Sequence, residues 1–293
     1  MTIETVGVVG LGNMGLPMAA TLARKGFDVW GFDLSEERRR LAQAQGIHAV
    51  PELAGLLRRV DAVVASLPLG RDVEAMVRTP AGLLDRADRR VIVLDTSTAD
   101  ATTSRRLAAL LASRGHGHLD APVSGGPAGA AGGQLTMMIG GDDEDLSLAR
   151  PVVEALAARA VHVGPSGAGN VAKLINNMLV AAHLITNGEA FRLAEAAGVK
   201  AEAVLEVVNA ATGRSAVSEA FYPKWVLSGR FDSGFAAGLM RKDVGLAAEM
   251  AAELGLALPL SRHVAEIWSG SREELPDGAD FTRMTRYQAP DRE

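Results

Sequence analysis

Lys173 and Asn177 are the two residues whose types and spacing most directly suggest chemistry. They lie in the segment GAGNVAKLINN at 167–177, where glycines precede a long apolar stretch. Residues four apart lie on one face of a helix, so the amine and the amide could meet a substrate together. A lone lysine in a helix is far more often a surface charge, so the pair needs support from other motifs.

Two other segments stand out beside this one. The segment DAPVSGGP at 120–127 is predicted to be the end of a strand that runs into a glycine turn. Lys242 stands in LMRKD at 239–243, near the start of a predicted helix. The alternatives are a simple turn for the first segment and a solvated Lys–Asp pair for the second.

A glycine-rich turn predicts a dinucleotide site near the N-terminus. Gly10, Gly12 and Gly15 form G-x-G-x-x-G directly after an apolar strand and before a predicted helix at 14–25. The first glycine permits the turn, the second lets a pyrophosphate approach, and the third permits close helix packing. Asp33 ends the next strand, at the spacing expected for an acid that binds the adenine ribose.

The surroundings of Asp33 favour NAD over NADP. A carboxylate binds the free ribose 2′-hydroxyl and repels a 2′-phosphate. Its neighbour is Leu34 rather than the arginine that often accepts that phosphate. Arg38, Arg39 and Arg40 could compensate, but they are better explained as a solvated helix face.

The first half of the chain is predicted to be an α/β domain with a doubly wound parallel sheet, spanning residues 1–163. Short apolar runs alternate with amphipathic stretches, as expected for strands buried on both faces between helices. The predicted strands are 6–10, 29–33, 62–67, 91–95, a weaker run into Asp120, and 135–139; the predicted helices are 14–25, 36–45 and 102–113.

Residues 164–293 are predicted to be an all-α domain built on one helix at 167–197. About 30 helical residues would extend roughly 45 Å, too far to be buried against so small a domain. We therefore expect a partner subunit along this helix, in a homodimer or homotetramer. Further helices are predicted at 201–211, 239–254 and 260–268. A polar tail follows from Ser269, contains Pro276 and Pro290, and is expected to end in a loose segment.

Composition narrows the class of partner. The 293 residues carry a formal charge of −5 and include no cysteine. We expect no nucleic-acid partner, because a mildly acidic chain without a basic stripe binds it poorly, and no membrane partner, because no apolar run is long enough to span. Without cysteines or a signal-like N-terminus we expect the cytoplasm. The six scattered histidines lack the partners of a metal site, so no metal is expected.

Taken together, four motifs resemble those of the β-hydroxyacid dehydrogenase family, which includes 3-hydroxyisobutyrate dehydrogenase and tartronate semialdehyde reductase. They are GLGNMGLPMA at 10–19, DAPVSGGPAGA at 120–130, GAGNVAKLINN at 167–177 and KD at 242–243. They occur in family order and at family spacing over almost the whole chain. The resemblance implies hydride transfer between NAD(P) and a small β-hydroxyacid or its semialdehyde.

The resemblance also implies residue roles. Lys173 would be the general acid/base, with Asn177 and Ser124 completing the catalytic set. The substrate would be bound by Ser124, Gly125, Gly126, Lys173, Asn177 and Lys242. The cofactor would be bound by Gly10, Leu11, Gly12, Asn13, Met14, Gly15, Asp33, Leu67, Pro68, Thr98 and Lys242.

Substrate identity stays open at this point. The segment 213–225, where family members shape their pockets, is compact, and this puts 3-hydroxyisobutyrate itself in doubt; Arg214 and Ser215 are candidate contacts. The acid group could be a carboxylate, a sulfonate or a phosphonate. One alternative is an imine reductase, against which the retained Lys173 argues. Another is a catalytically silent dinucleotide-binding assembly module.

Overall fold

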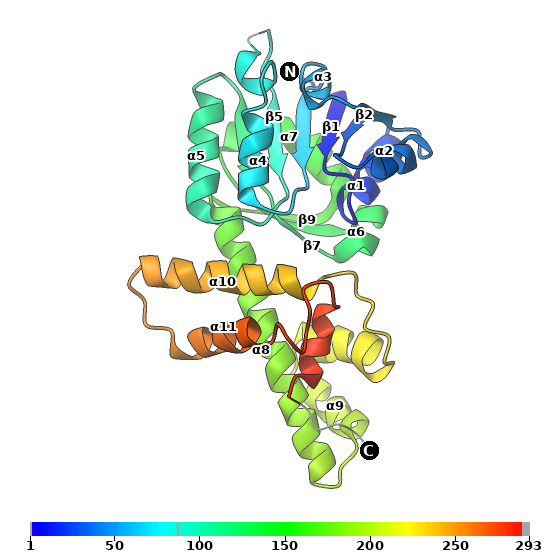
Figure 1. Cartoon of the computed structure of the whole chain (residues 1–293), viewed down its shortest axis with the longest axis vertical. Coiled ribbons are helices and arrows are strands. Elements are labelled where there is room, and N and C mark those ends of the chain that lie inside the picture. Colours follow the sequence, from blue (N-terminus) through cyan, green and yellow to red (C-terminus); the bar gives the residue numbers. More distant parts are fainter. Residues whose placement is uncertain (1, 87, 289–293) are drawn as a thin grey trace. The chain divides into compact units, whose positions relative to one another are not determined.

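The chain forms two compact units, Met1–Lys173 and Leu174–Glu293. The computed structural model describes residues 2–86 and 88–288. The first unit is a sheet covered by helices, and the second is helical (Figure 1). The domain boundary expected at residues 163 and 164 remains a prediction.

The sheet of the first unit has the strand order of a doubly wound dinucleotide-binding fold. Its order is β3-β2-β1-β4-β5-β6-β8-β7, with β9 paired to β8. The strands are β1 Thr5–Val9, β2 Asp28–Phe32, β3 His48–Ala49, β4 Ala62–Ala65, β5 Ile92–Asp95, β6 Gly117–Asp120, β7 Val123–Ser124, β8 Leu135–Gly140 and β9 Ala157–Gly164. All pairs from β3 to β6 are parallel, so their carboxyl ends share one edge. The strand order reverses between β1 and β4, where ligands bind in folds of this type.

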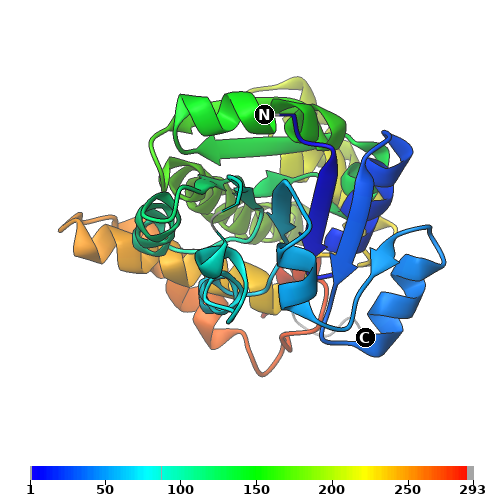
Figure 2. The same ribbon diagram turned by 90° about the horizontal axis from the view of Figure 1, so that it is seen from above.

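Helices cover both faces of the sheet, with α1 and α7 on one face and α4 and α5 on the other (Figure 2). The helices are α1 Gly15–Arg24, α2 Glu36–Gln43, α3 Leu53–Leu57, α4 Gly70–Val77, η1 Leu83–Asp85, α5 Ala101–Ala112, α6 Gly126–Gly132 and α7 Asp143–Leu156. Strand β4 is wholly apolar because both of its faces are buried. Ala62 and Val64 enter the core on one face, while Val63 and Ala65 enter the core on the other.

The expected α/β fold with a doubly wound, mainly parallel sheet is confirmed, and the one departure from parallel pairing is at β8. β8 runs antiparallel to both β6 and β7. Strands β3, β7 and β9 were not expected individually. Strand β3 and strand β7 are two residues long, and β9 is an edge strand whose residues are mostly exposed, so none has a continuous apolar run.

The helical unit is organised around the end of a long helix. Its elements are α8 Ala168–Ala196, which begins in the first unit, α9 Ala201–Ala210, η2 Val217–Leu227, α10 Ala237–Glu253, α11 Pro259–Gly270 and η3 Phe281–Arg286. The long helix expected at 167–197 is therefore confirmed. Trp268 is fully buried and donates its indole N–H to the carbonyl of Ala181 at 3.4 Å, so it packs α11 against α8.

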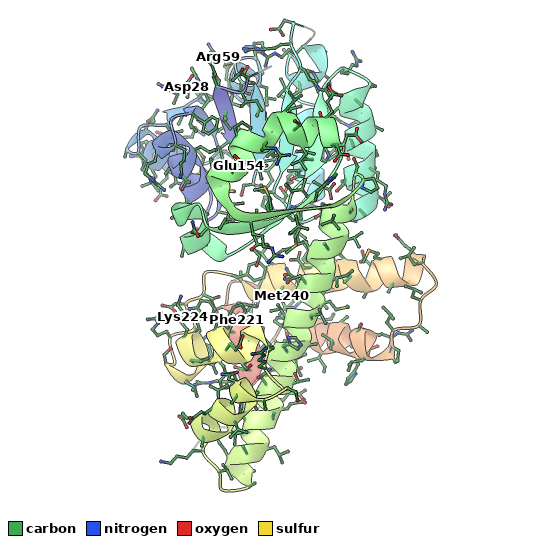
Figure 3. All side chains as sticks on the ribbon, turned by 180° about the vertical axis from the view of Figure 1, so that it is seen from behind. Asp28, Arg59, Glu154, Phe221, Lys224 and Met240 are labelled. Carbon is green, nitrogen blue, oxygen red and sulfur yellow. The ribbon has the colours of Figure 1, made fainter. Side chains whose placement is uncertain are left out.

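Two segments of this unit form helices that were not predicted. Residues 217–227 form a π-helix. It contains Pro223, which has no backbone N–H to donate and so interrupts the α-helical hydrogen-bond pattern. The polar tail from Ser269 includes η3 and packs into the core up to residue 288, while its expected loose end stays a prediction. Phe281 and Met284, three apart as in a 3₁₀ turn, are buried in the same core as Met240 of α10, which is labelled in Figure 3. Residues 289–293, including Pro290, lie outside the described residues.

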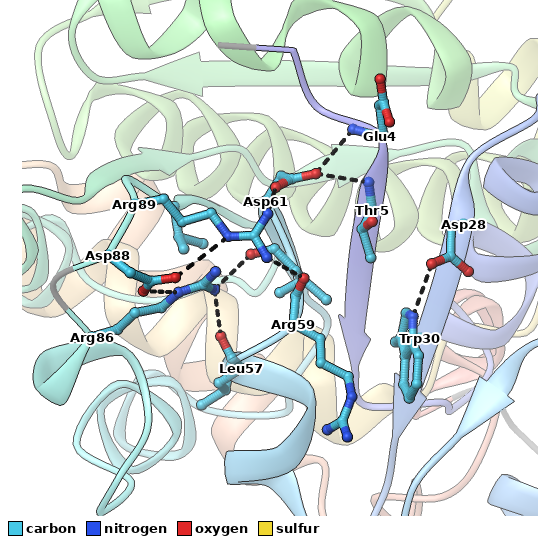
Figure 4. A network of polar contacts seen from close by, with 12 residues as sticks. Glu4, Thr5, Asp28, Trp30, Leu57, Arg59, Asp61, Arg86, Asp88 and Arg89 are labelled. Atoms are coloured by element: carbon cyan, nitrogen blue, oxygen red, sulfur yellow. Dashed lines mark hydrogen bonds and ion pairs between the residues drawn. The ribbon is translucent and has the colours of Figure 1, made fainter.

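A polar network closes the amino edge of the sheet (Figure 4). Asp61 accepts hydrogen bonds from two backbone N–H groups at the start of β1 and pairs with Arg89. The buried guanidinium of Arg86 donates to the carbonyl oxygens of Leu57 and Val60. These hydrogen bonds and ion pairs join the start of β1 to the loops before β4 and β5, so this network stabilises the edge opposite the predicted cofactor residues.

Candidate active site

The turn between β1 and α1 has two positions that only glycine fits. Gly10 has a φ of +90°, and a Cβ there would overlap the carbonyl oxygen of Ser66. A Cβ on Gly15 would overlap the carbonyl oxygen of Gly10. At Gly12 a Cβ would lie in open space, which is the room that a pyrophosphate needs beside the backbone. Because the first N–H groups of a helix have no acceptor within it, the start of α1 fits the phosphates of a dinucleotide.

Asp33 follows β2 at the same edge and orders the glycine turn. One carboxylate oxygen accepts the N–H of Leu11 at 2.8 Å, and the other accepts the N–H of Ser35 at 2.8 Å. Arg39 donates to the carbonyl oxygens of Asp33 at 2.6 Å and Leu34 at 3.1 Å. The carboxylate is thus fixed beside the turn, where it can accept a hydrogen bond from a ribose hydroxyl.

The remaining predicted cofactor residues of the first unit follow neighbouring parallel strands. Leu67 and Pro68 come after β4, and Thr98 comes after β5. The two loops are joined, because the N–H of Leu67 donates to the hydroxyl of Ser97 at 3.0 Å. The fold therefore gathers at one edge the predicted set Gly10, Leu11, Gly12, Asn13, Met14, Gly15, Asp33, Leu67, Pro68 and Thr98. These residues fit a nicotinamide dinucleotide.

Ser124 and the two glycines after it form the turn between β7 and α6. Ser124 pairs with Thr136 of β8. Gly125 and Gly126 have φ values of +127° and +64°, conformations that favour glycine. A Cβ on Gly126 would meet nothing, so a small ligand could approach the backbone there.

Asp120, the last residue of β6, holds the start of α8. It is fully buried, and its two oxygens accept the N–H groups of Gly167 at 2.7 Å and Asn170 at 2.9 Å. Burial raises the pKa of the Asp120 carboxyl, and these N–H groups oppose the rise. The carboxylate thereby caps the helix that carries Lys173 from a strand 50 residues away in the chain.

Lys173 lies in the second turn of α8, and its side chain is only 8% exposed. Charged lysine heads are seldom buried unless they have a partner or a function. Its burial therefore argues against the alternative that Lys173 is an ordinary surface charge on a helix.

In the helical unit, Asn177 and Lys242 meet at one carboxylate. The amide nitrogen of Asn177 donates to Asp243 at 2.6 Å, and the ammonium of Lys242 lies 3.2 Å from the other Asp243 oxygen. The amide oxygen of Asn177 accepts a hydrogen bond from Asn176 at 3.0 Å. Asp243 is almost fully buried and orients both predicted substrate ligands.

Three polar residues of these clusters were missed as individual contributors. They are Asp120, Asn170 and Asp243. Each stands inside one of the quoted motifs, but each has a hydrogen-bond partner between 47 and 71 residues away. The motifs identified the segments in which these residues stand. Which distant groups they bind could be seen only in the folded structure.

The two candidate substrate contacts before η2 differ in their surroundings. Ser215 is already engaged, since its hydroxyl accepts the N–H of Ser218 at 3.2 Å and its N–H donates to the Ser218 hydroxyl at 2.8 Å. This reciprocal pair begins η2. Arg214 is exposed.

Two histidines of the first unit, His116 and His118, are buried. The ring of His116 accepts the N–H of Val91 and lies 2.8 Å from the carbonyl of Leu83. Burial lowers the pKa of His118 to about 4, so its ring is neutral at neutral pH. Across residues 2–86 and 88–288, no three His, Asp or Glu side chains are arranged to hold a metal ion. Within the same residues, no helix combines the length and apolar character of a membrane span.

Two family models together match nearly the whole chain. Residues 5–164 match the NAD-binding domain of 6-phosphogluconate dehydrogenase. Residues 167–288 match the NAD-binding domain of NADP-dependent 3-hydroxyisobutyrate dehydrogenase. With the glycine turn and Asp33, these matches define an NAD(P)-dependent oxidoreductase.

Relatives narrow the class. The 2-(hydroxymethyl)glutarate dehydrogenase of Eubacterium barkeri is 34% identical over 91% of this chain and 89% of its own length. The NAD-dependent L-serine dehydrogenase of Pseudomonas aeruginosa is 37% identical over 88% and 89%. The structure of Mycobacterium tuberculosis 3-hydroxyisobutyrate dehydrogenase with L-serine superimposes with a TM-score of 0.88, at 36% identity over 98% of this chain and 99% of that one. This chain belongs to the β-hydroxyacid dehydrogenase family.

Proposed function

We propose that this enzyme interconverts a small β-hydroxyacid and its semialdehyde, with Lys173 as the general acid/base. The observation that carries the proposal is the buried side chain of Lys173, on a helix start fixed by Asp120 to the carboxyl edge of the sheet. A lysine amine in such a place can take the proton from a substrate hydroxyl during oxidation and return it during reduction. Bound NAD(P) supplies the hydride acceptor or donor.

The other predicted residues bind and orient the substrate in this proposal. Ser124, Gly125 and Gly126 donate hydrogen bonds to the acid group. Asn177, oriented by Asp243, donates to the substrate oxygen beside Lys173, and Lys242 adds positive charge for an anion. Positioning of this kind lowers the barrier because the reacting groups need no further ordering.

The names of the relatives suggest the substrate class. Hydroxyisobutyrate, serine and 2-(hydroxymethyl)glutarate all carry a hydroxymethyl group on the carbon beside a carboxylate. We propose that this fragment is what the enzyme recognises, with a carboxylate as the acid group. The third substituent on that carbon differs among the three names, and we leave it to a substrate panel.

NAD is the proposed cofactor rather than NADP. The Asp33 carboxylate is fixed beside the glycine turn, and Arg39, the nearest candidate for a 2′-phosphate, already donates to the carbonyls of Asp33 and Leu34. Both features favour an adenine ribose without the additional phosphate.

We also propose a homodimer or homotetramer. The connection between α10 and α11 exposes four leucines, Leu254, Leu256, Leu258 and Leu260, and α8 exposes Ile175 and Leu179. Exposed apolar patches of this kind favour a protein interface. The absence of cysteine and the net charge of −5 support a cytoplasmic enzyme that acts on a small molecule rather than on nucleic acid.

Lys173→Ala tests the function. NAD(H) and NADP(H) turnover would be measured on a panel of β-hydroxyacids and semialdehydes, with Lys200→Ala, an exposed lysine, as the control. We expect Lys173→Ala to lower kcat about 10²–10⁴-fold, while NADH binding followed by fluorescence is unchanged. Unchanged turnover in Lys173→Ala would reject the acid/base role. Imine reduction alone would favour an imine reductase, and cofactor binding without turnover of any substrate would favour a silent binding module.

A further inference from the structure

A buried polar junction joins three segments of the first unit that the proposed function uses. Asp120 and Asn170 stand at its centre, and both are fully buried. Asp120 ends the strand that leads to Ser124. Asn170 lies in the first turn of α8, three residues before Lys173, and its N–H donates to Asp120 at 2.9 Å.

The side chain of Asn170 adds the third segment. Its amide oxygen accepts the N–H of Ala99 at 3.1 Å, and its amide nitrogen donates to the hydroxyl of Ser104 on α5 at 2.9 Å. The orientation of this amide is determined, because a backbone N–H can only donate and must face the oxygen. Ala99 directly follows Thr98, a predicted cofactor residue.

The helix side of the junction leaves little room for movement. A Cβ on Gly169 would overlap the carbonyl oxygens of Asp120 and Met138, so the helix start lies directly against β6 and β8. Residues three apart are neighbours on a helix surface, so Asn170 and Lys173 share that rigid turn. The loop after β5 is joined to the turn through the Asn170 amide.

We propose that Asn170 is a positioning residue, whose amide sets the loop that carries Thr98 in register with the helix turn that carries Lys173. The inference rests on the proposed role of Lys173. Asn170 acts through these two segments and needs no contact with substrate. Its loss should therefore lower the rate of the chemical step more than it weakens cofactor binding.

The test compares Asn170→Leu, which keeps the branching and the number of side-chain heavy atoms and removes the amide, with His116→Phe. His116 is a matched control because it is a buried side chain that accepts a backbone N–H at the other end of β5, from Val91. We expect Asn170→Leu to lower kcat about 10- to 100-fold, as for a misplaced catalytic group, with the Kd for NADH within about threefold of the wild type. His116→Phe should lower Tm comparably and leave kcat within about twofold.

The double variant Lys173→Ala/Asn170→Leu separates positioning from general damage. If Asn170 acts through Lys173, the double variant should be no slower than Lys173→Ala alone, because residues that act as a unit are not additive. Multiplied losses would overturn the inference, as would wild-type kcat in Asn170→Leu or an equal kcat loss in His116→Phe. Full turnover in Lys173→Ala would instead remove the proposed function and the inference with it. If Asn170→Leu does not fold, Ser104→Ala replaces it in the test. This variant removes one of the two side-chain hydrogen bonds of Asn170, so we expect a smaller loss of kcat.

Discussion

At the scale of single residues, Asp33 has a structural task and is also our proposed ligand of the adenine ribose. Its carboxylate orders the backbone at Leu11 and Ser35, so a substitution that removed the acceptor altogether would disturb the glycine turn as well as the cofactor. Asparagine keeps one oxygen for the N–H of Leu11 and removes the negative charge. This makes the charge itself testable.

We predict that Asp33→Asn shifts cofactor preference toward NADP. The ratio of kcat/KM for NADP to that for NAD should rise at least about tenfold, because the repulsion of the 2′-phosphate is lost. Steady-state kinetics with both cofactors measures the ratio. Asp28→Asn, at the exposed start of the same strand, should leave it unchanged. A wild-type enzyme that already prefers NADP would contradict our assignment of the cofactor.

At the scale of elements, the glycines of the β1–α1 turn have different tasks: two are required by the fold, and one is proposed to make room for the cofactor. Gly10 and Gly15 are required by the protein's own backbone, since an added Cβ at either position would overlap a carbonyl oxygen. Gly12 meets no such limit and lies where phosphate is expected. Two single substitutions in one motif should therefore fail for different reasons.

Gly15→Ala should destabilise the protein by about 1–3 kcal/mol, because its Cβ meets backbone that cannot move aside. Gly12→Ala should leave the free energy of unfolding within about 0.5 kcal/mol of the wild type and weaken NADH binding more than about tenfold. Urea unfolding and NADH fluorescence titration measure the two quantities. Equal NADH affinity in Gly12→Ala and wild type would mean that the phosphates bind elsewhere.

At the scale of the whole molecule, several exposed leucines follow one another closely in the helical unit. The segment from Leu254 to Leu260 exposes four leucines and no charge. Exposing such an apolar segment to water is unfavourable. We propose that a second copy of the chain packs against it.

Leu256→Asp combined with Leu260→Asp should therefore reduce the oligomer to smaller species, because buried carboxylates without partners oppose association. Light scattering after size-exclusion chromatography gives the mass directly. Leu34→Asp is the control, since Leu34 is 90% exposed and lies in the first unit. A monomeric wild type would refute the proposed assembly, and an intact oligomer in the double variant would place the interface on another surface.

Local patterns in the sequence determined much of this protein. The runs around β1, β4 and β5 are apolar because both faces of each strand are buried, and this produces a signal within four or five residues. The glycine turn and the long helix are equally local, because each depends on residues within one or a few turns. Even the four motifs at 10–19, 120–130, 167–177 and 242–243 could be recognised segment by segment.

Only the tertiary structure decided the direction of β8, the ordered end of the chain at η3, and the partners of the buried polar groups. The carboxylate of Asp120 finds the N–H of Asn170 50 residues away, and Asp243 finds Asn177 66 residues away. Periodicity reports which side of an element is buried, but it carries no information on which distant residue lies opposite. Because a buried polar group must be satisfied wherever the fold places it, those pairings follow from the packing of the whole unit rather than from any one segment.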